Sequence, residues 1–182
     1  ATGAGALAAP AFALTPVAPP LAKPIPSSGE ALPVVGLGTW ITFNVGNDPA
    51  ARDTSAEVMR AFLAAGGRMI DSSPMYASSQ DVVGYGLKKL GLPKIFSAEK
   101  VWISGGARGQ AQMEKSRRLW GVEKFDLIQV HNLLDWETHL PALLDMLDNA
   151  GDLAALTRSS RRCIAVPVDD KRWLPVPPAR LK

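Results

Sequence analysis

Four strand-like runs, most of them largely apolar, alternate with four helix-like segments along residues 34–151, and this alternation limits the possible folds more than any other feature of the sequence. The strand-like runs are VVGLGTW, RMID, IFSAEKVW and FDLIQVHN. Strict alternation is typical of a parallel sheet covered by helices, whose buried strands are nearly continuous apolar runs. The pattern therefore predicts an α/β fold. It leaves both an open doubly wound sheet and part of an eight-stranded barrel possible.

Two of the helical segments carry specific signals. Thr54 and Glu57 have the spacing of a capping box, which predicts that the first helix begins there, and the glycine pair at 66–67 predicts its end. The second helix is expected to be weak because Gly84 and Gly86 lower its intrinsic stability. The other two helices are expected over residues 110–120 and 140–151.

The amino-terminal part of the chain differs in composition from the rest. Residues 1–13 are uncharged, small or apolar and end in a small-x-small pattern that a signal peptidase accepts. We therefore expect either the remnant of a signal peptide or a disordered leader. The first implies an exported or periplasmic protein, and the alternative is a cytoplasmic one. A proline-rich linker is expected over residues 14–26, and the folded part over 27–151, opening with a small hairpin.

The overall charge and the cysteine count exclude several classes of function. The net charge of +3 comes without a basic stripe interleaved with aromatic residues, so we predict no nucleic-acid binding. A single cysteine, Cys163, excludes a disulfide within the chain and a cysteine-based metal cluster. No apolar segment is long enough to predict a stable membrane span.

Ionisable side chains follow three of the strand-like runs, at their carboxyl ends. Asp71 ends the second run, and Tyr76 lies in the loop beyond it. Lys100 lies near the end of the third run and His131 near the end of the fourth. In barrels and open parallel sheets alike, catalytic sites are built at this edge. Each residue alone has a structural explanation, such as a loop cap or a packed core histidine, but together they predict a catalytic site.

The order of these residues and the sequence around them resemble the aldo/keto reductase family. The segment Asp-Ser-Ser-Pro-Met-Tyr at residues 71–76 matches the family's Asp-x-x-x-x-Tyr motif, and Lys100 and His131 stand where the family has its third- and fourth-strand catalytic residues. The resemblance covers about Pro24–Gly151. It implies the first half of a (β/α)8 TIM-type barrel, with about four βα units, that binds a nicotinamide cofactor, usually NADPH, without a Rossmann domain.

The resemblance implies the reduction of a small aldehyde or ketone, which needs a hydride at carbon and a proton at oxygen. We expect Tyr76 to donate the proton, although a free phenol with a pKa of ~10 is a weak acid near neutral pH. Lys100 is expected to favour the phenolate, and Asp71 to keep Lys100 protonated. His131 is expected to orient the substrate by a hydrogen bond to its oxygen. The cofactor would supply the hydride.

Aromatic residues also follow the strand-like runs, at the same carboxyl-terminal edge of the predicted sheet, which we call the rim. In the family pattern, aromatic residues of these loops line the substrate pocket, which suits an apolar carbonyl compound; alternatively, they only cover the barrel. The residues concerned are Trp40, Trp102 and Trp136. His139 is expected to be a helix-start residue without chemistry, and no metal site is predicted because ligand spacing is missing. No residue can be matched to the cofactor phosphates.

The sequence departs from the family pattern after the fourth helix, where residues 152–182 become rich in arginine and proline. A complete barrel needs about 200 residues or more. We therefore expect a C-terminally truncated barrel with a possible fifth strand at 162–166, an irregular tail, weak cofactor binding, and exposed edges that favour self-association.

Two alternatives to a reductase remain at this point. The first is a non-catalytic truncated remnant or binding module of the same fold. The second is an aldolase that uses Lys100 as a Schiff-base nucleophile. Asp71 argues against the aldolase, because a neighbouring carboxylate would keep the amine of Lys100 protonated.

Overall fold

The computed structural model of the chain describes residues 19–26, 28–148, 165–169 and 172–175. A parallel four-stranded sheet in the order β3–β4–β5–β6 forms its centre. Its strands are β3 (Leu37–Gly38), β4 (Met69–Asp71), β5 (Phe96–Val101) and β6 (Leu127–Val130). The helices that alternate with them are α1 (Pro49–Ala64), α2 (Ser79–Lys89), α3 (Gly106–Trp120) and α4 (Trp136–Asp148).

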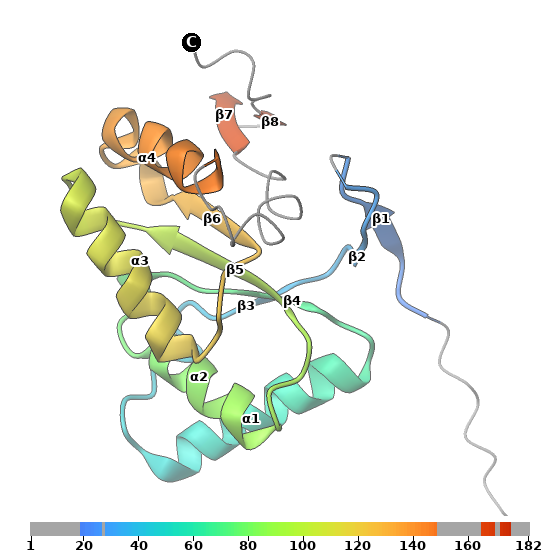
Figure 1. The fold of residues 1–182 in the computed structure, drawn as a ribbon. Coiled ribbons are helices and arrows are strands. Elements are labelled where there is room, and N and C mark those ends of the chain that lie inside the picture. The colour runs from blue at the N-terminus through green and yellow to red at the C-terminus, as the bar shows by residue number, and fades with distance from the viewer. Residues whose placement is uncertain (1–18, 27, 149–164, 170–171, 176–182) are drawn as a thin grey trace, which may run out of the picture.

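The helices follow one another around one side of the sheet, each packed against the next (Figure 1). This arrangement confirms the predicted α/β fold with a parallel sheet. Within the described ranges, no helix combines the length and the apolar character that a bilayer crossing requires.

The first helix begins earlier than its predicted capping box. Asp48 is the N-cap: its Oδ1 accepts hydrogen bonds from the backbone N–H groups of Ala50, at 2.9 Å, and Ala51, at 3.1 Å. The hydroxyl of Thr54 donates instead to the carbonyl oxygen of Ala50 within the helix, at 3.0 Å. The predicted start at Thr54 is therefore wrong, because proline at N1 and an aspartate before it form the stronger start signal.

The two glycines that weaken α2 allow it to pack closely between its neighbours. A Cβ atom on Gly84 would lie 1.8 Å from the carbonyl oxygen of Leu119 in α3. A Cβ atom on Gly86 would lie 2.4 Å from the sulfur of Met59 in α1. The helix forms despite its low propensity, because the missing side chains let both neighbouring helices approach.

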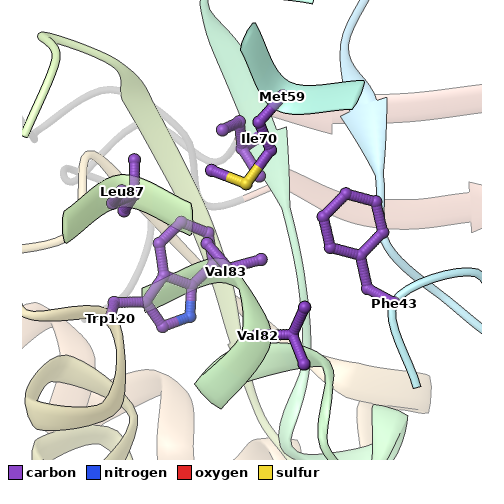
Figure 2. Close-up of a cluster of buried hydrophobic side chains, with 7 residues drawn as sticks. All are labelled: Phe43, Met59, Ile70, Val82, Val83, Leu87 and Trp120. Carbon is purple, nitrogen blue, oxygen red and sulfur yellow. The ribbon is translucent and has the colours of Figure 1, made fainter. Parts of the chain in front are cut away.

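The main hydrophobic core lies between the sheet and the first three helices (Figure 2). It contains the largest fully buried side chain, Trp120, which packs edge-on against Phe125 with ring centres 5.4 Å apart. Burial of each large side chain contributes about 1.5–3 kcal/mol. The cluster consists of Phe43, Met59, Ile70, Val82, Val83, Leu87 and Trp120. It anchors β4, whose carboxyl end carries the first candidate residue.

The predicted amino-terminal hairpin is present as β1 (Ala22–Pro24) and β2 (Ala31–Pro33), paired antiparallel. It begins within the expected linker, before the predicted boundary at residue 27. Arg68, just before β4, forms an ion pair with Glu30 at 2.9 Å and donates to the carbonyl of Ala31 at 3.3 Å. The hairpin is thus held at the amino end of β4, opposite the predicted site. A cavity of about 510 Å³ lies at this same end.

The carboxyl-terminal part does not extend the parallel sheet as predicted. Of the expected fifth strand at 162–166, residues 162–164 lie outside the described ranges. Residues Ala165–Asp169 form β7, which pairs antiparallel with β8 (Arg172–Pro175) in a separate sheet. The expected leader over residues 1–13 and most of the expected irregular tail also lie outside the described residues.

Candidate active site

Parallel pairing of β4 and β5 brings Asp71 and Lys100 together. Asp71 pairs in register with Ala98, and side chains two residues apart on a strand point to the same face. Lys100 Nζ lies 2.5 Å from Asp71 Oδ2 and also donates to the carbonyl oxygen of Ser72 at 2.8 Å. The side chain of Lys100 is only 12% exposed and that of Asp71 29%, so this ion pair is largely shielded from water.

Tyr76 ends the short helix η1 (Pro74–Tyr76) and lies over this ion pair. Lys100 Nζ is 5.3 Å from the centre of the phenol ring. Burial raises the pKa of Tyr76, and the carboxylates of Asp71 and Glu99 raise it further. The expected net lowering of this pKa is therefore not found, because burial of the phenol, followed by the charge of Asp71, outweighs the effect of the ammonium.

His131 begins the turn η2 (His131–Leu133) directly after β6, and its ring meets Tyr76. The two rings are arranged edge to face, with centres 5.7 Å apart. On the other side, Nδ1 of His131 is 2.6 Å from Oγ of Ser73. Burial lowers the pKa of His131, and the charge of Lys100 lowers it further. The imidazole is therefore neutral at pH 7. The structure thus brings all four predicted ionisable residues to one rim.

Two of the three predicted tryptophans contact the candidate residues. The Trp40 ring centre is 6.5 Å from that of Tyr76, and the Trp102 ring centre is 6.4 Å from that of His131. Both indoles are exposed at the rim, at 63% and 38%. Trp136 begins α4 on the same rim, but among the described aromatic pairs it contacts neither ring. The first two tryptophans form apolar walls beside the phenol and the imidazole.

The loops that carry these residues contain strained backbone. Ile41, beyond β3, has a φ of 64°, and Ala77, beyond η1, has a φ of 50°. Asn132, Leu133 and Asp135, beyond β6, each have a φ of 54°. Left-handed backbone is costly for residues with a Cβ atom and persists only where the surrounding structure imposes it, most often at functional sites. Leu92, at the opposite end of the sheet, also has a φ of 54°, but the other five described non-glycine residues with positive φ lie at this rim, which supports its assignment as the functional end of the sheet.

His139 lies in the first turn of α4 and is buried. Its Nε2 donates to the carbonyl oxygen of Ile103 at 2.5 Å. Its ring packs on Gly109 of α3, where a Cβ atom would lie 2.4 Å from His139 Cε1. The side chain therefore joins α4 to α3 and to the loop after β5. No group of three or more potential metal-ligating side chains occurs in the described part of the chain.

Polar residues that were not predicted from the sequence form hydrogen bonds that hold the loops and side chains of the site in place. The Thr39 hydroxyl donates to the carbonyl oxygen of Asp71 at 2.9 Å, and Ser79 donates to the carbonyl oxygen of Thr39 at 3.1 Å. Ser73 contacts His131, as described above. Of these, only Ser73 lies inside the Asp-x-x-x-x-Tyr motif, so the motif alone could have pointed to it.

Glu99, next to Lys100 on β5, is fully buried on the opposite face of the sheet. Its carboxylate accepts hydrogen bonds from Gln80 Nε2, Trp120 Nε1 and the backbone N–H of Lys100, each at 2.8 Å. Burial nevertheless raises the pKa of Glu99 to about 7. The network joins α2 and α3 to the strand that carries Lys100.

We expect this glutamate to make the protein less stable as the pH rises from 4.5 to about 7. In that range the folded state binds a proton that the unfolded state has lost, so the free energy of unfolding falls by on the order of 3 kcal/mol. The measurement is urea denaturation of the wild type and Glu99→Gln at several pH values. The wild type should lose stability relative to Glu99→Gln as the pH rises, because glutamine does not titrate. A constant difference would contradict the raised pKa.

Comparison with known families agrees with this geometry. The family model described as "Aldo/keto reductase family" matches residues 34–159. The chain belongs to the aldo/keto reductase family. The resemblance seen in the Asp-x-x-x-x-Tyr motif and the strand-end residues is thereby confirmed.

Curated members of the aldo/keto reductase family align with the same part of the chain. The methylglyoxal reductase of Escherichia coli (strain K12) is 36% identical over 114 residues, which cover 60% of this chain and 39% of that protein. An aldehyde reductase of Saccharomyces cerevisiae is 27% identical over 149 residues, which cover 81% of this chain and 42% of that protein. The chain thus spans less than half the length of these relatives.

Solved aldo/keto reductase structures share the fold. An enzyme from Klebsiella pneumoniae in complex with NADPH superposes with a TM-score of 0.59 at 24% identity, over 70% of this chain and 46% of that chain. The glycerol dehydrogenase of Gluconobacter oxydans superposes with a TM-score of 0.60 at 25% identity, over 71% of this chain and 45% of that chain. The parallel sheet and its helices are therefore a partial TIM-type barrel, as the resemblance implied.

Proposed function

We propose that this protein reduces an aldehyde or ketone to an alcohol with NADPH, and that Tyr76 donates the proton. The observation that carries the proposal is the position of Lys100 Nζ, 2.5 Å from Asp71 Oδ2 and 5.3 Å from the centre of the Tyr76 ring. A phenol beside an ammonium held by a carboxylate suits proton transfer to a developing alkoxide. Relatives described as methylglyoxal and aldehyde reductases, and family structures with bound NADPH, support this choice of reaction and cofactor.

The proton transfer follows from the charges around Tyr76. Its raised pKa keeps the phenol protonated at neutral pH, so the proton is present when the reaction begins. When bound, the reduced nicotinamide supplies the hydride that adds to the carbonyl carbon. The carbonyl oxygen then becomes more basic than a phenolate, so the O–H bond of Tyr76 breaks and the new O–H bond of the alcohol forms. Lys100 stabilises the phenolate that remains, until solvent returns a proton to it.

His131 would orient the substrate in this reaction. As a neutral imidazole it can donate one hydrogen bond through Nε2, because Nδ1 already faces Ser73. The edge-to-face contact with Tyr76 lets both side chains address the same oxygen. The substrate carbonyl would thus accept one hydrogen bond from each side chain, with its carbon open to hydride.

The walls of the rim fit a flat apolar reactant and the nicotinamide ring. Trp40 and Trp102 flank the phenol and the imidazole with largely apolar faces. An aromatic or otherwise apolar aldehyde suits these walls better than a highly charged one. The residues present therefore fit the reacting end of the cofactor, whereas none of the described residues is assigned to its phosphates.

The contacts of Lys100 argue against the aldolase alternative. Its amine donates to the carboxylate of Asp71 and to the carbonyl oxygen of Ser72. Both contacts use the amine as a hydrogen-bond donor, whereas a Schiff base forms through a free lone pair on the nitrogen.

The proposal is tested by NADPH consumption with benzaldehyde. We expect Tyr76→Phe to lower kcat/KM about 100-fold to 10,000-fold, because it removes the proton donor and little else. NADPH binding, followed by fluorescence, should not change. The chain has two tyrosines, so Tyr85→Phe is a matched control. The Tyr85 hydroxyl bonds Asp53 across α1 and α2, away from the rim, and its loss should leave turnover unchanged.

Other outcomes would favour the alternatives. Equal turnover by the wild type and Tyr76→Phe would contradict the role of the phenol. No NADPH binding and no turnover would support a non-catalytic binding module. Trapping of a carbonyl substrate on Lys100 by borohydride would support the aldolase.

A further inference from the structure

Ser73 connects the loop after β4 to the candidate histidine. It is fully buried and precedes η1 as its N-cap residue. Its Oγ accepts a hydrogen bond from the backbone N–H of Met75 at 3.2 Å and lies 2.6 Å from Nδ1 of His131. This second contact joins residues 58 positions apart in the chain. Such a short contact between a fully buried hydroxyl and a partly buried imidazole restricts the orientation of the ring.

We propose that Ser73 is a positioning residue: its hydroxyl donates to Nδ1 of His131 and so keeps the imidazole proton on Nε2, where it can bind the substrate oxygen. The role in reduction rests on the function proposed above. The direction of the hydrogen bond can be measured without it. Ser73 does not itself touch the substrate, so its effect passes through His131.

The direction of this hydrogen bond follows from the inventory of donors. A serine hydroxyl has one proton and two lone pairs. A backbone N–H can only donate, so one lone pair of Ser73 is taken by Met75. Within the described ranges, Nδ1 of His131 is the only acceptor found for the remaining proton of Ser73. If Nδ1 carried the proton instead, the buried hydroxyl would have a donor without an acceptor, which is costly.

The location of the imidazole proton matters because His131 carries only one at neutral pH. Burial and the charge of Lys100 lower the pKa of His131, so the doubly protonated ring is disfavoured. With the proton on Nδ1, the lone pair of Nε2 would face the lone pairs of the carbonyl oxygen and repel them. The Nε2–H form attracts that oxygen.

The neighbouring residue, Ser72, provides a matched comparison. Both serines are fully buried. The Oγ of Ser72, however, is a buried polar atom without a hydrogen-bond partner among the described residues. Removal of the Ser72 hydroxyl should therefore leave the histidine unaffected, whereas removal of the Ser73 hydroxyl should not.

The test is ¹⁵N NMR of the imidazole nitrogens in the full 182-residue chain at pH 7, which distinguishes the two neutral tautomers directly. The chain has two histidines. His139 Nε2 lies 2.5 Å from the carbonyl oxygen of Ile103, which can only accept, so His139 is an internal reference for the Nε2–H form. We expect the Nε2–H form of His131 to exceed the Nδ1–H form by at least about tenfold, because the Nδ1–H form would leave the buried Ser73 hydroxyl without an acceptor. A predominant Nδ1–H form of His131 would overturn the proposal.

Variants then link the tautomer to catalysis. Ser73→Ala should shift the His131 tautomer ratio about tenfold towards Nδ1–H and lower kcat by a similar factor, with the NADPH KM unchanged. Ser73→Thr keeps a hydroxyl and should therefore show the wild-type tautomer ratio and the wild-type kcat. If Ser73 were important only for stability, kcat would not change in step with the tautomer ratio. Ser72→Ala should show the wild-type tautomer. Equal ratios in Ser73→Ala and the wild type would overturn the proposal.

The two proposals fail in different ways. Absence of turnover by the wild type would overturn the proposed reduction and the role of Ser73 in it, while the NMR spectrum still decides the hydrogen bond. Turnover by a wild type whose His131 is in the Nδ1–H form would overturn the role of Ser73 and the hydrogen bond from His131 to the substrate, but not the reduction or the role of Tyr76. Because the wild-type spectrum alone can overturn the proposal, the proposal can be tested even if Ser73→Ala does not fold.

Discussion

Replacement of Lys100 by methionine is expected to lower kcat/KM for carbonyl reduction by about 100-fold to 10,000-fold. Methionine retains much of the volume of the lysine side chain but removes its charge. The phenolate of Tyr76 would then form beside Asp71 with no cation to stabilise it. The measurement is NADPH consumption with benzaldehyde by the wild type and the variant at equal concentrations.

The same substitution should also destabilise the fold. Asp71 would keep a carboxylate that is only 29% exposed and has lost its partner. Breaking a buried ion pair costs about 3–5 kcal/mol, and the partial exposure of Asp71 places the expected loss near the lower end. Urea denaturation of Lys100→Met should therefore show a lower free energy of unfolding.

A double variant separates the two effects. Asp71→Asn combined with Lys100→Met removes the unpaired carboxylate, so most of the lost stability should return. Turnover should stay low, because no cation lies near Tyr76. A double variant that regains turnover would show that Lys100 acts through stability alone. Wild-type turnover in Lys100→Met would contradict its role in stabilising the phenolate.

The second large effect is expected from Gly84→Ala in α2. The new Cβ atom would lie 1.8 Å from the carbonyl oxygen of Leu119 and 2.9 Å from its carbonyl carbon. Both are backbone atoms, so α2 and α3 must move apart. We expect a net loss of about 2–4 kcal/mol, because overpacking outweighs the gain of about 1 kcal/mol in helix propensity. Thermal unfolding followed by circular dichroism should show a Tm lower by roughly 5–15 °C.

Two other glycines in helices provide controls for this prediction. Gly86→Ala meets the flexible end of Met59, which can move, so its loss should be smaller. Gly106→Ala in α3 meets only Thr138 Cγ2, at 3.5 Å, and should be neutral or stabilising. If Gly84→Ala and Gly106→Ala had the same Tm, the close approach of α2 and α3 would not be what requires glycine.

Local patterns in the sequence were sufficient to predict the alternating architecture and the candidate residues. Buried parallel strands tend to be apolar, so β4 and β6 are readable as short apolar runs, whereas β5 is recognised from its place in the alternation. Asp71 and Tyr76 belong to one short motif, and Lys100 and His131 lie at the ends of the next two strands. These features are local in the chain, and parallel pairing then brings them together at one edge.

Where signals compete, the local pattern was less informative. Asp48 and Thr54 both resemble helix starts, and the choice between them depends on which side chain reaches a free backbone N–H group. The local pattern was also insufficient for the predicted fifth strand, because an apolar run does not specify which other strand it pairs with. β7 pairs with β8 and not with the parallel sheet.

Contacts between distant segments decided the remaining features of the site. The contact between Ser73 Oγ and His131 Nδ1 spans 58 positions, and the need for glycine at Gly84 arises from α3. The direction of the Tyr76 pKa shift depends on burial and on the charges that meet around it. Desolvation and Coulomb energies depend on distances in space, so the sequence identifies the reacting groups, whereas their protonation and orientation follow from the packing.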